Sequence, residues 1–463
     1  MMRAPDALPL HLMLMMMQSG ISPNAYAPWN ASSWNFDNPF MPKMKSPLEH
    51  GLDQWQEQNR KLSDQFLSAW LPKSRNPFAD NNPSSRRTTG SRFTGKEAGP
   101  RREDGVTGAE WTDLFPHFMQ PEFLQSLGEK AFANSAGFMQ GMQAYLNSDY
   151  VREEPDYPVI WQNGSARLLD LDPKNTDGLA ILMVPSLINK SYVLDLTQEN
   201  SFAQYLKQQG FRPLVLDWGT PGEDEKEFGT DEYMTGYALH ALQTLREKHD
   251  GPIALLGYCM GGIFAVAMTQ LAQLYVDALI LLATPWDFSA EDTPRVLLEP
   301  GTQLMLGNWI DTQNPVQPLV TQTLFHLIDP WRVQEKYSRY PSLDDAGQQH
   351  FLAVEQWVND GVPLTQKVAR ECFVDWPQKN ILATHKWKVG RKWIEPSSIT
   401  CPTLAVIPTK DAIVPVGVAE PLTREIPRCD VLRPESGHVS MVVGKNAKAV
   451  LWKPLVAWLN EKF

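Results

Sequence analysis

The chain has 463 residues, enough to bury a large core and to form about two to three domains of ordinary size. Hydrophobic residues make up 43% and charged residues 21%, a globular composition that excludes a wholly disordered chain. The formal net charge of -11 argues against a general electrostatic grip on nucleic acid, so we expect no nucleic-acid partner. The four cysteines form neither a disulfide framework nor a CxxC metal motif, which predicts a reducing, cytoplasmic setting.

Residues 1–110 are rich in Pro, Asn, Ser and Arg, and we expect this extension to be largely disordered. Within it, residues 47–71 place apolar side chains at three- and four-residue steps, which predicts an amphipathic helix. Two interpretations of this helix stay open: it packs on the main domain or a partner, or it adheres to a lipid-like or polymer surface. The apolar stretch 8–17 is interpreted as a sticky tail rather than a signal peptide, because Asp6 lies where a signal peptide is basic.

A helical lead-in over 111–150 precedes the globular part of the chain. No run of about 18 uninterrupted apolar residues occurs, so no transmembrane helix is predicted. Short apolar strands then alternate with helices, as expected for a mostly parallel sheet covered by helices on both faces. The predicted strands are 179–184, 213–217, 253–256, 278–283, 403–407 and 430–433. The predicted helices are 200–209, 231–249, 262–274 and 447–460, with Thr230 as the N-cap of the second.

The alternation of strands and helices breaks between about 287 and 396. This segment is rich in Trp, Gln and Arg and has no clear strand order before residues 386–393. We interpret it as an insertion that forms a cap over an edge of the sheet. The chain from 151 to 463 is therefore predicted to be one α/β domain with an inserted cap.

The strongest local motif is the segment 257–262, Gly-Tyr-Cys-Met-Gly-Gly, which follows a predicted strand and opens a predicted helix. This context is typical of a nucleophile elbow, in which glycines allow a sharp turn from strand to helix. The turn would present Cys259 at the carboxyl edge of the sheet and aim the Met260 N–H at a developing oxyanion. The alternative is that Cys259 is a small buried residue in an ordinary glycine-rich turn.

An elbow needs a base and a carboxylate that orients it, in the chain order nucleophile, acid, histidine. Asp411 follows the strand 403–407, and His438 follows the strand 430–433. The sequence thus predicts a triad of Cys259, Asp411 and His438, with His438 as base and Asp411 fixing its tautomer. A thiolate nucleophile exchanges one thioester for another at little cost, which favours acyl transfer over hydrolysis where a cap excludes water.

From about residue 150 onward the chain resembles the polyhydroxyalkanoate synthases, a family with an α/β-hydrolase core. The segments that carry the resemblance, in one order along the chain, are 184–196, 217–221, 257–262, 357–360, 388–391, 410–415 and 436–438. The sequence departs from the family pattern at Ala412, where His is usual, and at Val416, where Trp is frequent.

The resemblance implies that Cys259 is the acylated thiol, His438 the general base and Asp411 its partner. It further implies Leu187 as a second backbone donor to the oxyanion and Asn189 as a substrate contact. The implied substrate is a 3-hydroxyacyl-CoA thioester, with release of CoA, growth of a polyester on the enzyme and no further cofactor. Members of the family act as homodimers on polymer granules in the cytoplasm, so a granule surface and a second subunit are the implied partners.

Three functions remain open from the sequence alone: a polymerising acyltransferase, a hydrolase of thioesters, lactones or polymer, and a granule-binding protein without activity. The basic cluster Lys386, Lys388, Arg391 and Lys392 has two interpretations, a contact for CoA phosphates or a solvated hairpin face. We find no metal-binding motif and no dinucleotide fingerprint in the sequence.

Overall fold

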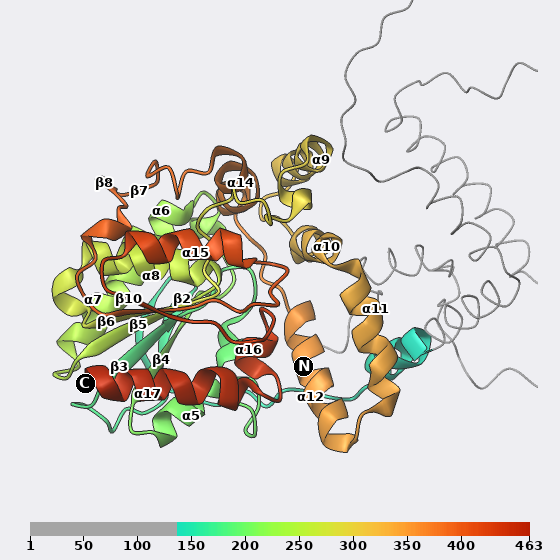
Figure 1. The fold of residues 1–463 in the computed structure, drawn as a ribbon, viewed down its shortest axis with the longest axis horizontal. Coiled ribbons are helices and arrows are strands. Elements are labelled where there is room, and N and C mark those ends of the chain that lie inside the picture. The colour runs from blue at the N-terminus through green and yellow to red at the C-terminus, as the bar shows by residue number, and fades with distance from the viewer. Residues whose placement is uncertain (1–136) are drawn as a thin grey trace, which may run out of the picture. The chain divides into compact units, whose positions relative to one another are not determined.

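The computed structural model describes residues 137–463, except for the side chains of residues 330 and 331 (Figure 1). The expectations for the extension 1–110, including the helix at 47–71 and the tail at 8–17, lie outside the described residues. So does most of the lead-in 111–150, of which the described part is a helix that ends at residue 146.

An eight-stranded sheet forms the centre of the domain, in the order β1-β2-β4-β3-β5-β6-β9-β10. Its strands are β1 Val159–Asn163, β2 Ala166–Asp170, β3 Ala180–Val184, β4 Arg212–Asp217, β5 Ile253–Tyr258, β6 Ala278–Leu282, β9 Thr403–Val406 and β10 Cys429–Leu432. The pairs from β4 to β10 are parallel, whereas β1 with β2 and β2 with β4 are antiparallel. The predicted mostly parallel sheet is therefore confirmed.

Helices cover both faces of this sheet, as Figure 1 shows with α5 and α17 on one side and α7, α8 and α15 on the other. The helices are α5 Phe202–Gln208, α6 Thr230–Glu232, α7 Leu239–Glu247, α8 Met260–Leu271, α9 Pro300–Asp311, α10 Pro318–Ile328, α11 Pro330–Arg339, α12 Asp345–Asn359, α13 Gln366–Arg370, α14 Trp376–Lys379, α15 Val416–Glu425, α16 Ser440–Val443 and α17 Lys453–Lys462. Three π-helical segments adjoin them: η4 Tyr233–Ala238, η8 Glu371–Asp375 and η10 Lys448–Trp452.

Alternate side chains of one strand enter different cores, which is why the central strands are apolar throughout. In β3, Leu182 packs toward α7 and α8, whereas Ile181 and Met183 pack toward α5 and α17. All five residues of β3 and all six of β5 are buried. Burial on both faces explains the continuous apolar runs from which these strands were predicted.

The hairpin β1–β2 is an element that the apolar runs did not predict. Its first strand, Val-Ile-Trp-Gln-Asn, is largely exposed at the edge of the sheet, so it lacks an apolar run. The signal that was available is the two-residue turn Gly164–Ser165 after Asn163, with Gly164 at φ +52°.

The helix predicted over 231–249 is correct in position but wrong in its cap. Thr230 is the first helical residue, and Gly229 before it is the N-cap. The Thr230 N–H donates instead to the Glu371 carboxylate, at 2.8 Å. The first turn is fixed by Glu232, whose carboxylate accepts the Gly229 N–H at 2.6 Å.

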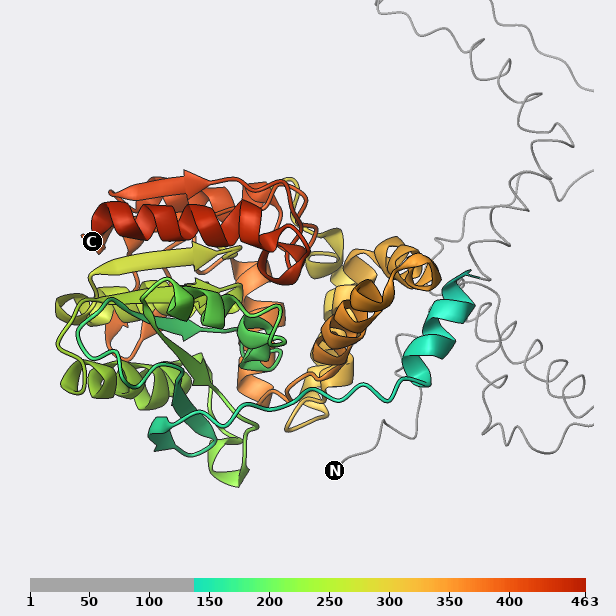
Figure 2. The same cartoon turned by 90° about the horizontal axis from the view of Figure 1, so that it is seen from below.

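Between β6 and β9 the chain forms the helices α9 to α14 and the short hairpin β7 Lys388–Val389 and β8 Lys392–Trp393. Figures 1 and 2 both show α10, α11 and α12, coloured yellow to orange, beyond one end of the sheet. A backbone bridge between Asn189 and Gly361 ties the end of α12 to the loop that follows β3. These helices therefore lie against the carboxyl ends of the parallel strands.

Candidate active site

The turn between β5 and α8 holds Cys259 in a backbone conformation that side chains rarely adopt, with φ 56° and ψ −126°. The two glycines that follow in α8, Gly261 and Gly262, have no space for a side chain. A Cβ on Gly261 would lie 2.0 Å from the Val184 carbonyl oxygen, and one on Gly262 would lie 1.8 Å from the Thr284 hydroxyl oxygen. The glycines thus let α8 start directly against the end of β3, and the expected sharp turn at 257–262 is confirmed.

Asp411 and His438 form a buried pair in the loops after β9 and β10. Nδ1 of His438 lies 2.6 Å from Oδ2 of Asp411, and the two residues are 8% and 7% exposed. The other Asp411 oxygen accepts the backbone N–H groups of Ile413 and Val414, at 2.8 and 2.9 Å. With the carboxylate fixed in this way, Nδ1 of His438 is the donor, which leaves Nε2 for a reacting group.

The His438 imidazole also contacts Tyr258, the last residue of β5. The two ring centroids are 5.3 Å apart, at an interplanar angle of 31°. The Tyr258 hydroxyl donates to the His438 backbone carbonyl at 3.3 Å. Reasoning from sequence missed Tyr258 because it reads there as one more buried strand residue, although its place before Cys259 puts it beside the predicted nucleophile.

Opposing effects set the pKa of His438. Burial disfavours the imidazolium, but the Asp411 carboxylate and the charge and hydrogen bond of Cys259 outweigh burial and raise this pKa well above its ordinary value. The arrangement therefore favours the imidazolium form of His438 beside the Cys259 sulfur, with the Asp411 carboxylate behind it. Such a pair supplies a nucleophile together with a proton donor for the leaving group.

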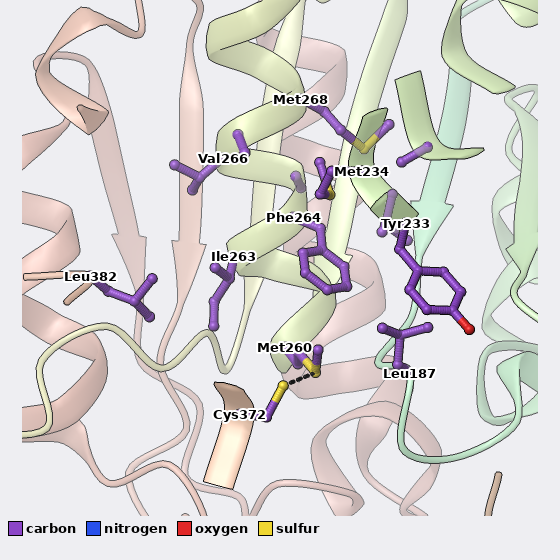
Figure 3. Close-up of a cluster of buried hydrophobic side chains, with 14 of the residues drawn as sticks. Leu187, Tyr233, Met234, Met260, Ile263, Phe264, Val266, Met268, Cys372 and Leu382 are labelled. Carbon is purple, nitrogen blue, oxygen red and sulfur yellow. Dashed lines mark hydrogen bonds between the residues drawn. The ribbon is translucent and has the colours of Figure 1, made fainter. Parts of the chain in front are cut away.

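Met260 and Leu187, the two expected oxyanion donors, flank the Cys259 turn. Figure 3 shows both side chains in the apolar cluster that surrounds α8. Met260 is the first residue of α8, so its N–H has no acceptor inside the helix. Neither residue lines the cavity described below, but Ser186 before Leu187 and Cys259 before Met260 both do.

The cavity has a volume of about 560 Å³ and is mostly apolar, a size that suits a small organic ligand. Cys259, Asp411 and His438 all line it. Its walls come from α10, α11 and α12 on one side and from the loops after β3, β9 and β10 on the other. The predicted triad residues, which are up to 179 positions apart in sequence (438 minus 259), thus share one chamber.

Asn189 also lines this cavity, but its side-chain amide is engaged by the end of α12. The amide nitrogen lies 3.4 Å from the backbone carbonyl oxygens of both Trp357 and Val358. Asn189 therefore joins the loop after β3 to the helices above it. A contact with substrate, as the family resemblance implies, would use the rest of its amide group and stays a prediction.

The basic cluster Lys386, Lys388, Arg391 and Lys392 does not line the cavity. Its hairpin β7–β8 lies against α6, where the Gly390 N–H donates to Asp231. Lys388 places its ammonium 4.0 Å from the centre of the Trp393 ring. This location favours the interpretation as a solvated hairpin face.

The other three cysteines lie in settings that keep them as thiols. Burial raises the pKa of Cys401 and of Cys429 to about 11 in each case. Burial likewise raises the pKa of Cys372 well above its usual value, and its Sγ lies 3.6 Å from the sulfur of Met260 (Figure 3). Cys259 is the one cysteine of the described chain that lines the cavity.

Within residues 137–463 no cluster of side chains has the composition of a metal site. The helices in that same range include none that is long and apolar enough to cross a membrane.

Residues 180–445 match a protein-family model described as alpha/beta hydrolase fold. This match covers more than half of the chain, and the chain belongs to that fold family, as its sheet order and its strand-turn-helix elbow also indicate. Several proteins named poly(3-hydroxyalkanoate) polymerase are similar to the chain, and the resemblance predicted from the sequence motifs is confirmed.

Two of these relatives carry the name poly(3-hydroxyalkanoate) polymerase subunit PhaC. The chain is 27% identical to that of Haloferax mediterranei over 66% of its own length and 63% of the relative's, so it spans less than two thirds of this relative. It is 27% identical to that of Allochromatium vinosum over 75% of its own length and 100% of the relative's. Among solved structures, a putative non-heme bromoperoxidase from Mycobacterium tuberculosis aligns with 68% of the chain and all of its own, at 13% identity and a TM-score of 0.42.

Proposed function

We propose that this protein is an acyltransferase that polymerises 3-hydroxyacyl groups from CoA thioesters into a polyester. The observation that carries the proposal is the arrangement of Cys259 beside the buried pair His438 and Asp411, in the wall of a mostly apolar cavity. The family of its relatives supplies the substrate class, a 3-hydroxyacyl thioester.

In the first half of the reaction, the Cys259 thiolate attacks the carbonyl carbon of the acyl-CoA thioester. The negative charge that develops on the carbonyl oxygen is stabilised by the backbone N–H groups of Met260 and Leu187. The bond from carbon to the CoA sulfur then breaks, and His438 gives its proton to the departing thiolate. The products are free CoA and an acyl thioester on Cys259.

In the second half, the hydroxyl group of a 3-hydroxyacyl chain attacks the Cys259 thioester. Neutral His438 accepts the hydroxyl proton as the new ester bond forms, and the Cys259 thiolate leaves. Asp411 holds the imidazole in the tautomer that both steps need. A mostly apolar cavity disfavours water as the competing acceptor, which supports transfer over hydrolysis.

Incubation with 3-hydroxybutyryl-CoA tests the proposal. We expect release of CoA together with insoluble polymer. Release of CoA with only free 3-hydroxybutyrate would identify a hydrolase instead. No release from a folded protein would leave a binding role without catalysis and would refute the proposal.

The same proposal includes action as a homodimer at the surface of polymer granules, as the family resemblance implies. The test is attachment of the full chain to isolated granules, compared with a variant that lacks residues 1–110. If the apolar face predicted at 47–71 is adhesive, deletion reduces attachment while release of CoA in solution continues. Unchanged attachment would refute this part, and a monomeric mass of the active enzyme in solution would refute the dimer.

A further inference from the structure

Four cations line the cavity: Lys190, Arg332, Lys336 and Lys445. Two of them are neutralised in place. Lys190 pairs with Asp360 at 3.0 Å, and Lys336 pairs with the buried Glu355 at 2.6 Å. The side chains of Arg332 and Lys445, by contrast, have no ion-pair or hydrogen-bond partner in the described part of the chain.

The two unpaired cations lie near the segment that presents His438. The Arg332 guanidinium, which comes from α11, packs against Gly437, where an added Cβ would lie 2.6 Å from one guanidinium nitrogen. Lys445 comes from the chain directly after α16, the short helix that follows His438. Both side chains are exposed, so they lie where the cavity opens to solvent. The nearest acidic cavity residue in the sequence, Asp329, uses its carboxylate to accept the Arg332 backbone N–H at 3.2 Å.

We propose that Arg332 and Lys445 form the subsite for the phosphate groups of the CoA substrate, with the pantetheine arm running from this rim to Cys259. This inference rests on the proposed function. CoA joins a thioester to several phosphate charges through a flexible arm, so its site needs unpaired cations on the wall of the cavity that holds the nucleophile. Arginine and lysine are the side chains that bind phosphate most effectively. The cavity that Arg332, Lys445 and Cys259 line together is mostly apolar, which suits the uncharged part of the arm.

The first test compares two substrates with the same acyl group, the CoA thioester and the pantetheine thioester, which lacks the phosphates. For Arg332→Gln and for Lys445→Gln we expect KM for the CoA thioester to rise by about tenfold each, the usual effect of losing one bond to a charged group. The constants for the pantetheine thioester stay as in the wild type. An equal rise for both substrates, or no rise for either, would overturn the inference.

Lys392→Gln is the matched control, because Lys392 is an exposed cation on the hairpin β8, away from the cavity. We expect it to change neither KM. If Lys392→Gln instead raised KM for the CoA thioester while both cavity variants left it unchanged, the phosphates would bind the hairpin and the inference would be wrong. If Arg332→Gln disturbs the loop around Gly437, the result for Lys445→Gln alone still tests the inference.

A binding measurement separates this inference from the proposed function. Free CoA is titrated calorimetrically into the Cys259→Ala protein, which needs no catalysis. Binding that weakens in the Arg332→Gln and Lys445→Gln backgrounds, and with added salt, supports the subsite even if the wild type releases no CoA. Binding that is unchanged in both backgrounds, or no binding at all, refutes the subsite whatever the activity.

Discussion

The hydroxyl group of Tyr258 donates to the backbone carbonyl of His438 at 3.3 Å, while the two rings lie 5.3 Å apart. One residue therefore holds both the backbone and the ring of the expected base, and it directly precedes the expected nucleophile. Because Tyr258 is 3% exposed and follows the rigid strand β5, the contact links the position of His438 to the centre of the sheet.

Tyr258→Phe removes the hydrogen bond but keeps the ring. Loss of one such bond costs about 1 kcal/mol, so we expect kcat to fall by about fivefold with KM for acyl-CoA little changed. Tyr258→Leu, which also removes the ring, should reduce kcat further. Equal melting temperatures of the wild type and Tyr258→Phe would show that the effect is local. A Tyr258→Phe enzyme with unchanged kcat would mean that the bond does not position His438.

Asp411→Asn removes the carboxylate that raises the pKa of His438, and we expect activity to fall by about 10²- to 10⁴-fold. Because the pKa is raised in the folded state, protonated His438 stabilises the fold fully below its ordinary value of 6.5, and this contribution is lost as the pH rises through the raised pKa. The difference in melting temperature between wild type and Asp411→Asn should therefore be larger near pH 6.5 than at alkaline pH. A difference that grows with pH would contradict this assignment.

Alkylation should select Cys259 among the cysteines. A thiolate is the reactive form, and burial raises the pKa of Cys372, Cys401 and Cys429. At neutral pH we expect iodoacetamide to label Cys259 first, as read by peptide mass spectrometry. His438→Ala should slow that labelling without directing it elsewhere. Faster labelling of Cys372 than of Cys259 in the folded protein would oppose the assigned nucleophile.

Two glycines in helices should respond oppositely to alanine. Gly261→Ala forces a Cβ to within 2.0 Å of the Val184 carbonyl oxygen, so the elbow must shift, and we expect loss of activity and of several degrees in melting temperature. Gly307 in α9 has no atom within 4 Å of an added Cβ. Gly307→Ala should stabilise the fold by about 0.5–1 kcal/mol, because alanine restricts the unfolded chain and favours helix. Similar effects of both changes would mean that the elbow is not tightly packed.

A buried ion pair of β4 and β2 offers a test of stability away from the cavity. Arg212 and Asp170 are 2.6 Å apart with side chains 5% and 0% exposed, and His249 lies 3.1 Å from the same guanidinium. Asp170→Asn leaves Arg212 without its counter-charge, which costs about 3–5 kcal/mol. Denaturant unfolding measures this loss. At a temperature where the variant is folded, its activity should match that of the wild type. A loss of less than about 1 kcal/mol in the free energy of unfolding would refute the importance of the pair.

The parts of the fold that the sequence predicted are those where one physical requirement dominates. Strands buried on both faces must be apolar throughout, so β3 and β5 were recognisable, and the elbow at Cys259 needs its glycines. The edge strand β1 is exposed and was missed. The cap at Thr230 was misplaced because a distant carboxylate, Glu371, accepts its N–H, and a sequence pattern does not reveal such a contact.

In the candidate site, too, some features were predicted from the sequence and others were missed. Chain order and position after strands were enough to name Cys259, Asp411 and His438, since parallel strands bring their carboxyl ends to one edge. In the sequence, the adjacent charges of the cluster at 386–392 had two interpretations, a contact for CoA phosphates or a solvated hairpin face. The unpaired cations of the cavity, Arg332 and Lys445, come from two separate elements, so only the folded arrangement brings them to one chamber.

The most direct test of the account is the detection of a 3-hydroxyacyl thioester on Cys259. The wild-type protein is mixed with 3-hydroxybutyryl-CoA, quenched in acid within the first turnover and digested for peptide mass spectrometry. We predict an added 3-hydroxybutyryl group on the peptide that contains Cys259, matched by an equal amount of released CoA, and neither in Cys259→Ala. Continued release of CoA by Cys259→Ala, or an acyl group found on another residue, would contradict the account.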